Sequence, residues 1–124
     1  MNNPVVWFEI YVQDMPRARR FYESVLGVTL DKLEDPSGET DMFSFSMNPE
    51  GAGATGALVK MKGIASGGGG TLVYFGCQDC AVESGRVVAQ GGQLIRPKFS
   101  IGQYGHIALA ADPDGNMIGF HSMT

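Results

Sequence analysis

The sequence contains the same spacing pattern twice. The pair Gln13-Asp14 recurs as Gln78-Asp79, and Gly27 recurs as Gly92, each at an offset of 65 residues. Because the spacing within each half is kept while most side chains differ, the pattern predicts one supersecondary unit that is built twice. Two such units would leave a groove between them, where a ligand could bind.

Length and composition agree with a single domain built from two modules. A chain of 124 residues, of which 44% are hydrophobic and 18% charged, can bury roughly two-thirds of its unfolded surface. We expect one domain over residues 1–124, with a first module over about 1–62 and a second over about 71–124. Residues 63–70 carry no periodic pattern and are rich in glycine, which favours a flexible connector.

Charge and hydropathy narrow the possible partners. The formal net charge is −4, and no basic cluster exceeds Arg17, Arg19 and Arg20, which argues against nucleic acid. No window approaches the roughly 20 apolar residues that span a bilayer, so no membrane partner is expected. Two cysteines, Cys77 and Cys80, are too few for a disulfide framework, and we expect a cytoplasmic protein.

The order of predicted elements is the same in both modules. Residues 5–12 alternate with a period of two, as in a strand, and Asp14 is a suitable N-cap for a helix that Gly27 would end. Each module is therefore predicted to be β-α-β-β-β, in the α+β class. The remaining strands of the first module are predicted at 28–33, 42–47 and 57–61. In the second module we expect a helix over 80–90 and strands at 71–77, 93–97, 106–110 and 116–121.

Two blocks of sequence resemble a known family. The block 8–14, followed by Phe21-Tyr22 and Leu26-Gly27, and the terminal block 112–116 resemble the signature regions of the glyoxalase/bleomycin-resistance, or vicinal oxygen chelate, superfamily. The chain is most similar to its small lactoylglutathione-lyase-related members. The resemblance implies paired βαβββ modules that form a cupped, barrel-like mixed sheet with the helices outside, and a homodimer. It implies no single reaction, because the superfamily includes isomerases, dioxygenases, transferases and non-catalytic binders.

The metal ligands of the family can be compared position by position. The resemblance matches them to Trp7, Leu72 and Gly119, and to one residue within 57–61 that is most plausibly Lys60. Divalent ions bind imidazole, carboxylate or thiolate groups, and none of these residues carries one. We therefore predict no metal and no other cofactor. A relocated site built from Glu9, His106 and His121 is a weaker alternative.

The strand periodicity predicts which residues line the cup. If Trp7 faces it, Glu9 and Tyr11 do so too, and the alternate residues pack beneath the helix. The same reasoning places Lys60 and Leu58 together on the cup face. The predicted ligand-binding face consists of Trp7, Glu9, Tyr11, Lys60, Leu72, Tyr74, Met117 and His121. A mostly apolar surface with a few polar groups is typical of a small-molecule site.

Glu9 is the candidate catalytic residue, as a general acid or base. A structural ion pair with Lys60 would explain Glu9 equally well, and His106 and His121 could lie in turns or at the chain end rather than in the site. Two hypotheses follow for a protein that binds a small organic molecule. It is a metal-independent enzyme, or it sequesters a drug or metabolite without chemistry. A third hypothesis is a metal-dependent lyase or dioxygenase with relocated ligands.

Overall fold

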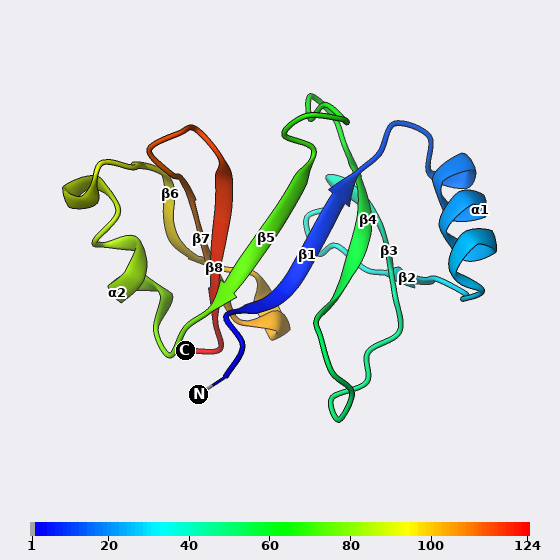
Figure 1. The fold of residues 1–124 in the computed structure, drawn as a ribbon, viewed down its shortest axis with the longest axis horizontal. Coiled ribbons are helices and arrows are strands. Elements are labelled where there is room, and N and C mark those ends of the chain that lie inside the picture. Colours follow the sequence, from blue (N-terminus) through cyan, green and yellow to red (C-terminus); the bar gives the residue numbers. More distant parts are fainter. Residues whose placement is uncertain (1) are drawn as a thin grey trace. The chain divides into compact units, whose positions relative to one another are not determined.

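A computed structural model describes residues 2–124 and contains two compact units (Figure 1). One unit is Trp7–Thr71, and the other consists of residues 2–6 and Leu72–Thr124. Each unit contains the predicted β-α-β-β-β order, so the α+β class and the two βαβββ modules are confirmed. Within residues 2–124 no helix is both long and apolar enough to cross a membrane.

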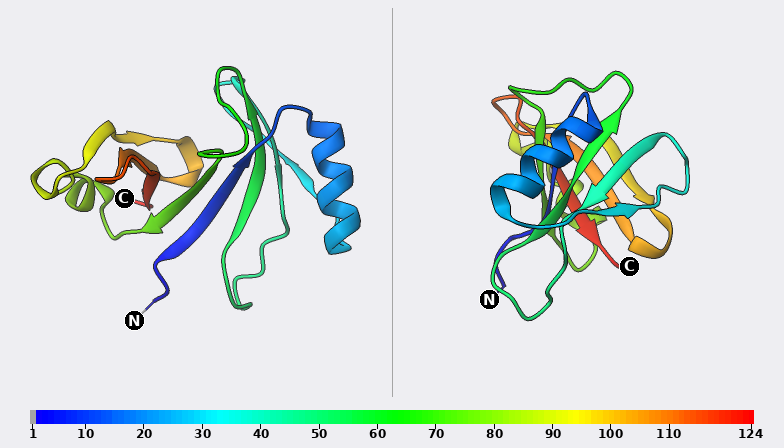
Figure 2. Two further views of the ribbon diagram at one scale, coloured as in Figure 1. Left: turned by 45° about the horizontal axis from the view of Figure 1, so that its top comes forward. Right: turned by 90° about the vertical axis from the view of Figure 1, so that its right-hand side faces the viewer.

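The first unit is a four-stranded mixed sheet with one helix on its face (Figure 2). Its strands follow the order β2-β3-β4-β1, in which β1 and β4 are parallel and the other neighbours antiparallel. The elements are β1 (Val5–Tyr11), α1 (Met15–Leu26), β2 (Asp31–Leu33), β3 (Thr40–Ser44) and β4 (Thr55–Met61).

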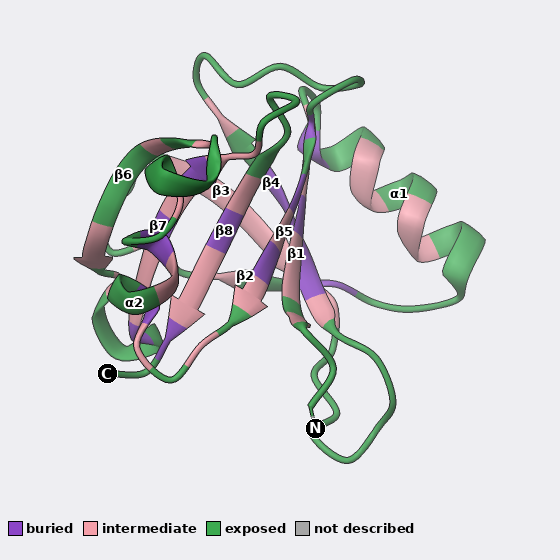
Figure 3. Ribbon diagram, turned by 60° about the vertical axis from the view of Figure 1, so that its left-hand side comes forward, coloured by how far each residue is buried: buried purple, intermediate pink, exposed green. Residues whose placement is uncertain are grey.

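Helix α1 has the predicted ends. The Asp14 carboxylate accepts a hydrogen bond from the Arg17 N–H at 3.0 Å, which satisfies one of the free donors of the first turn. Gly27 ends the helix in the left-handed region at φ 67°, where glycine is favoured. The helix covers a core of Met15, Leu30 and Leu58, and residues 56–59 form a buried stretch of β4 (Figure 3).

The second unit repeats this topology. Its order is β6-β7-β8-β5, with β5 and β8 parallel and the other neighbours antiparallel. The predicted helix over 80–90 is shorter than expected. It ends at Ser84, after which the N–H groups of Arg86 and Val87 bond three residues back, and a separate 3₁₀ turn follows. The elements are β5 (Thr71–Gly76), α2 (Cys80–Ser84), η1 (Val88–Gln90), β6 (Gln93–Ser100), η2 (Gly102–Tyr104), β7 (His106–Ala111) and β8 (Met117–Ser122).

Candidate functional site

The side chains of Trp7, Glu9 and Tyr11 meet on one face of β1. Glu9 is nearly buried, with 9% of its surface exposed. Trp7 Nε1–H donates a hydrogen bond to Glu9 Oε2 at 3.2 Å, and the Tyr11 hydroxyl donates one to Oε1 at 2.8 Å. The shared face predicted for these three residues is therefore confirmed. The result is a carboxylate whose position is fixed by the two aromatic residues beside it on the strand.

The electrostatics of this group keep Tyr11 protonated. Burial, the nearby negative charge of Glu9 and the hydrogen bond to it raise the pKa of the Tyr11 hydroxyl well above its ordinary range. Tyr11 therefore remains a hydrogen-bond donor at neutral pH. Hydrogen bonds donated to both oxygens of a carboxylate stabilise its charged form. The site can thus present an oriented negative charge among aromatic rings.

The glycine-rich segment 63–70 holds Tyr11 in place. The Ser66 hydroxyl donates a hydrogen bond to the Tyr11 carbonyl at 2.7 Å, and the Tyr11 N–H donates one to the Gly70 carbonyl at 2.8 Å. The Gln13 side chain donates to the Ile64 carbonyl at 2.9 Å and to Ser66 Oγ at 3.1 Å. The sequence predicts a flexible connector here and does not identify Gln13 or Ser66 as part of the support for Tyr11. The only signal was that Gln13 belongs to the repeated Gln-Asp pair.

A pocket of about 400 Å³ lies at the end of β1, between the first turns of α1 and the segment 63–70. Tyr11, Gln13, Arg17 and Ser66 are among its lining residues, and Glu9 is not. The cavity is therefore next to the hydrogen-bonded support of Tyr11 rather than at the Glu9 carboxylate.

Lys60 lies on the opposite face of the first sheet from Glu9. In the pairing of β1 with β4, Leu58 is aligned with Ile10, and both pack in the core beneath α1. Lys60 is two residues after Leu58 and shares its side of the strand, with its side chain exposed. The prediction that Leu58 and Lys60 share the face of Glu9 is wrong. The β4 residues on the Glu9 face are Ala57 and Val59, which are aligned with Glu9 and Tyr11.

The second unit contains the other predicted ligand-binding residues. Leu72 and Tyr74 are buried on β5, whereas Met117 on β8 is 40% exposed. Tyr74 is aligned with Gly119, and Gly76 with His121, so Tyr74 and His121 share one face as predicted. His121 Nε2 lies 2.6 Å from the Tyr104 carbonyl oxygen. Because a carbonyl can only accept, the imidazole donates this hydrogen bond, which links β8 to the turn η2.

His106 has a different environment, at the start of β7. Its Nδ1 atom is buried and has no hydrogen-bond partner among residues 2–124. Asp79 lies close enough to interact with it electrostatically, and Lys98 Nζ forms a 2.8 Å ion pair with Asp79 Oδ1. The hydrogen bond from Lys98 is the main cause that lowers the pKa of Asp79.

The residues at the family's metal positions do not fit a divalent ion. The Trp7 indole offers only an N–H group, which donates a hydrogen bond to Glu9. The Leu72 side chain has no atom that can bind a metal. At Gly119 the ring of Tyr74 occupies the space where a side chain would begin. The described part of the chain also contains no cluster of three or more His, Cys, Asp or Glu side chains that could hold a metal. No chemical step is therefore assigned to a metal.

Comparison with known proteins identifies relatives over most of the chain. The profile of the glyoxalase/bleomycin resistance protein/dioxygenase superfamily matches residues 5–120. A protein of Mycobacterium tuberculosis that is named as a candidate glyoxylase, CFP32, is 29% identical over 115 residues. The match covers 91% of this chain and 43% of the relative, so the chain spans less than half of that protein's length. A Mycobacterium bovis protein of the same name matches equally.

Solved structures with the same fold have low sequence identity. A methylmalonyl-CoA epimerase from M. tuberculosis has a TM-score of 0.71 at 16% identity, covering 98% of this chain and 88% of its own. A hypothetical protein from Bacillus halodurans has a TM-score of 0.72 at 14% identity, and the match covers 97% of this chain and 94% of that protein. A Streptomyces coelicolor methylmalonyl-CoA epimerase variant has a TM-score of 0.67 at 15% identity, with 96% of each chain covered. These similarities describe the fold.

Proposed function

Because the chain belongs to the glyoxalase/bleomycin resistance protein/dioxygenase superfamily, we propose that it binds a small organic molecule at the Glu9 face of β1 and transfers a proton without a divalent metal. The observation that carries this proposal is the Glu9 carboxylate, nearly buried and held by Trp7 and Tyr11. A fixed carboxylate beside aromatic surface is suited to general base catalysis on an apolar substrate.

The chemistry that fits this group is proton removal from a carbon next to a carbonyl group. The C–H bond breaks, the proton moves to a Glu9 oxygen, and the electron pair becomes an enolate on the substrate. Return of the proton from Glu9 completes the cycle. Tyr11 keeps its proton because its pKa is raised, so its hydroxyl can stabilise either the Glu9 carboxylate or the enolate oxygen. Several structures of the same fold are named as epimerases, an activity in which a stereocentre is inverted.

Sequestration without chemistry is the second candidate function. It is favoured by the observation that both Glu9 oxygens already accept hydrogen bonds from Trp7 and Tyr11. In this case the carboxylate orients the two rings, and the rings bind the ligand by stacking.

Hydrogen–deuterium exchange at carbon separates the two functions. Thioesters, 2-oxo acids and aryl ketones are incubated with the protein in D₂O, and loss of the α-proton signal is followed by proton NMR. We expect exchange in at least one class, and a loss of about 100-fold or more in Glu9→Gln, which retains the shape but not the basicity of Glu9. Glu39→Gln, at an exposed turn position, is the matched control and should exchange at the wild-type rate.

Three outcomes decide the result. If a compound binds to the wild type but no proton exchanges, the protein sequesters its ligand. If Glu9→Gln exchanges as fast as the wild type, Glu9 is not the base. If Glu9→Gln does not fold, as judged by its thermal transition, Tyr11→Phe replaces it, and unchanged exchange and binding in that variant would contradict a role for this face of β1.

A further inference from the structure

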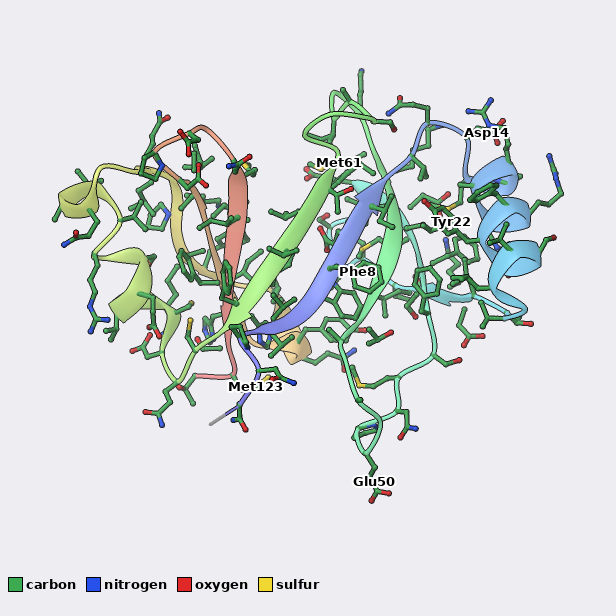
Figure 4. All side chains as sticks on the ribbon, in the orientation of Figure 1. Phe8, Asp14, Tyr22, Glu50, Met61 and Met123 are labelled. Carbon is green, nitrogen blue, oxygen red and sulfur yellow. The ribbon has the colours of Figure 1, made fainter. Side chains whose placement is uncertain are left out.

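A second pocket of about 420 Å³ lies on the other side of β1 from Glu9. Phe8 and Ile10 of β1 line it, and they alternate with Trp7 and Glu9 along the strand, so their side chains point toward α1. Figure 4 labels Phe8 on β1 and Tyr22 on α1, the strand and helix that form two walls of the pocket. The loop before β4 forms a third wall. This pocket is therefore separate from the face to which the proposed function is assigned.

Three aromatic side chains line this pocket. The rings of Phe8 and Phe45 are tilted, with their centroids 5.7 Å apart, and the rings of Tyr22 and Phe45 are edge-to-face at 6.2 Å. None of the three is fully buried. Their apolar surface is therefore in contact with water when the pocket is empty, and a ligand that covers it would gain hydrophobic stabilisation.

The loop opposite the rings fills little of this space with side chains. Its residues 51–54 have no side chain larger than a methyl group, and Ser46 and Asn48 also line the pocket. On the helix side Leu26 lines the pocket but is 57% exposed. The loop residues and Leu26 are exposed to solvent, so this pocket is an open groove that a ligand could enter from water.

The lining residues also define the charge of the occupant. None of them is charged, and the polar residues among them are Tyr22, Ser46, Asn48 and Thr55. The Thr55 hydroxyl donates to the carbonyls of Phe45 and Ser46, but no hydrogen bond of the Tyr22 hydroxyl is found among residues 2–124. Burial of a charged ligand here would be costly, since no opposite charge is present. A single polar group on a neutral ligand could pair with the Tyr22 hydroxyl.

We propose that the pocket beneath α1 binds a small, flat, uncharged aromatic molecule with one hydrogen-bonding group. The site is lined by Phe8, Tyr22, Leu26, Phe45, Ala52 and Ala54. Binding at this site requires neither Glu9 nor proton transfer, so this proposal can be tested independently of the proposed function.

The test uses 2-naphthol as the probe and naphthalene-2-sulfonate as its charged analogue. Binding is measured by calorimetry, and the site is located by backbone amide shifts in ¹⁵N-labelled protein. We expect saturable binding of 2-naphthol to the wild type, with the largest amide shifts at residues 45–55, and binding of the sulfonate at least about tenfold weaker. Saturation with shifts at Trp7, Glu9 and Tyr11 instead would overturn the proposal.

A substitution that fills the pocket provides the matched control. Ala54 precedes Gly56 by two residues, and Gly56 is aligned with Phe8, so a larger side chain at position 54 is directed to the face of Phe8. Ala54→Leu should weaken 2-naphthol binding by about tenfold or more. Ala65→Leu, at an exposed position outside the pocket, should bind as the wild type does. Should Ala54→Leu prove unstable, Ala52→Leu replaces it, and undiminished binding in a folded variant of either kind would contradict the assignment.

Discussion

At the scale of single residues, Gly119 is a position that the family resemblance matches to a metal ligand, and the structure leaves no room there for a side chain. Gly119 is buried on β8, and Tyr74 is aligned with it on β5. A Cβ atom built on Gly119 would overlap the Tyr74 ring, with Cγ at 3.0 Å and the ring edge closer still. Tyr74 is itself only 5% exposed, so the ring has little room to move away.

Gly119→Ala should therefore destabilise the protein. We expect the free energy of unfolding to fall by about 1–3 kcal/mol, the usual cost of overpacking a core. Urea denaturation measures the change. Gly68→Ala is the matched control, because its Cβ would meet no atom within 4 Å and it should stay near the wild-type value. Equal stability of Gly119→Ala and the wild type would mean that the Tyr74 ring moves freely, and the position would then be open to a ligand side chain.

The residues of the site differ in how well sequence could identify them. Trp7, Glu9 and Tyr11 were predictable because they lie two apart on one strand, and period two fixes their shared face. The face of Lys60 could not be obtained in this way, since it depends on the register between β1 and β4. Gln13 and Ser66 are 53 residues apart and meet only in the folded chain. Local patterns therefore predict which side chains of β1 share a face, and long-range contacts determine what supports that face.

At the scale of elements, turn chemistry and strand pairing decide the boundaries. The strand predicted at 28–33 begins only at Asp31, because the Leu30 N–H is bonded to Glu23 of α1 at 2.8 Å instead of to a strand. Between β2 and β3, the Asp35 carboxylate accepts hydrogen bonds from the backbone N–H and hydroxyl groups of Ser37 and Thr40, at 2.6 to 2.9 Å. One aspartate thus organises the whole turn.

This turn should make stability sensitive to acid. The hydrogen bonds, led by that of the Thr40 hydroxyl, lower the pKa of Asp35 from 3.8 to about 2. Because the pKa is lower in the folded state, Asp35 contributes fully to the free energy of unfolding above about pH 4. This contribution is lost as the pH falls towards 2. In urea denaturation from pH 7 to pH 2, Asp35→Asn should be less stable than the wild type at neutral pH and should approach it at pH 2.

A control separates this turn from the general effect of acid. Asp31→Asn removes a carboxylate that makes no side-chain hydrogen bond among the described residues. Its stability should decrease between pH 4 and pH 2 as steeply as that of the wild type. A parallel decrease in Asp35→Asn and Asp31→Asn would show that the turn does not contribute.

At the scale of the whole molecule, the two units share a topology but differ in chemistry. The strand orders β2-β3-β4-β1 and β6-β7-β8-β5 are equivalent, as the sequence repeat predicts. The first unit has the Glu9 group and both pockets, whereas the second has the Tyr74 ring over Gly119. A fold repeated in this way constrains backbone pairing and leaves the functional side chains free to diverge.

The proposal that this chain works without the family's metal is testable on the intact protein. Trp7, Leu72 and Gly119 offer no ligand atom for a divalent ion, so metal should add no stability through preferential binding to the folded state. Untagged, chelator-treated protein is therefore expected to melt within about 1 °C of its metal-free midpoint when Zn²⁺, Ni²⁺, Mn²⁺ or Fe²⁺ is added. Elemental analysis of freshly purified protein should detect no stoichiometric metal. A rise of several degrees that Glu9→Ala abolishes would instead identify Glu9 as a relocated ligand, and the carboxylate would then act by holding a metal rather than by accepting a proton.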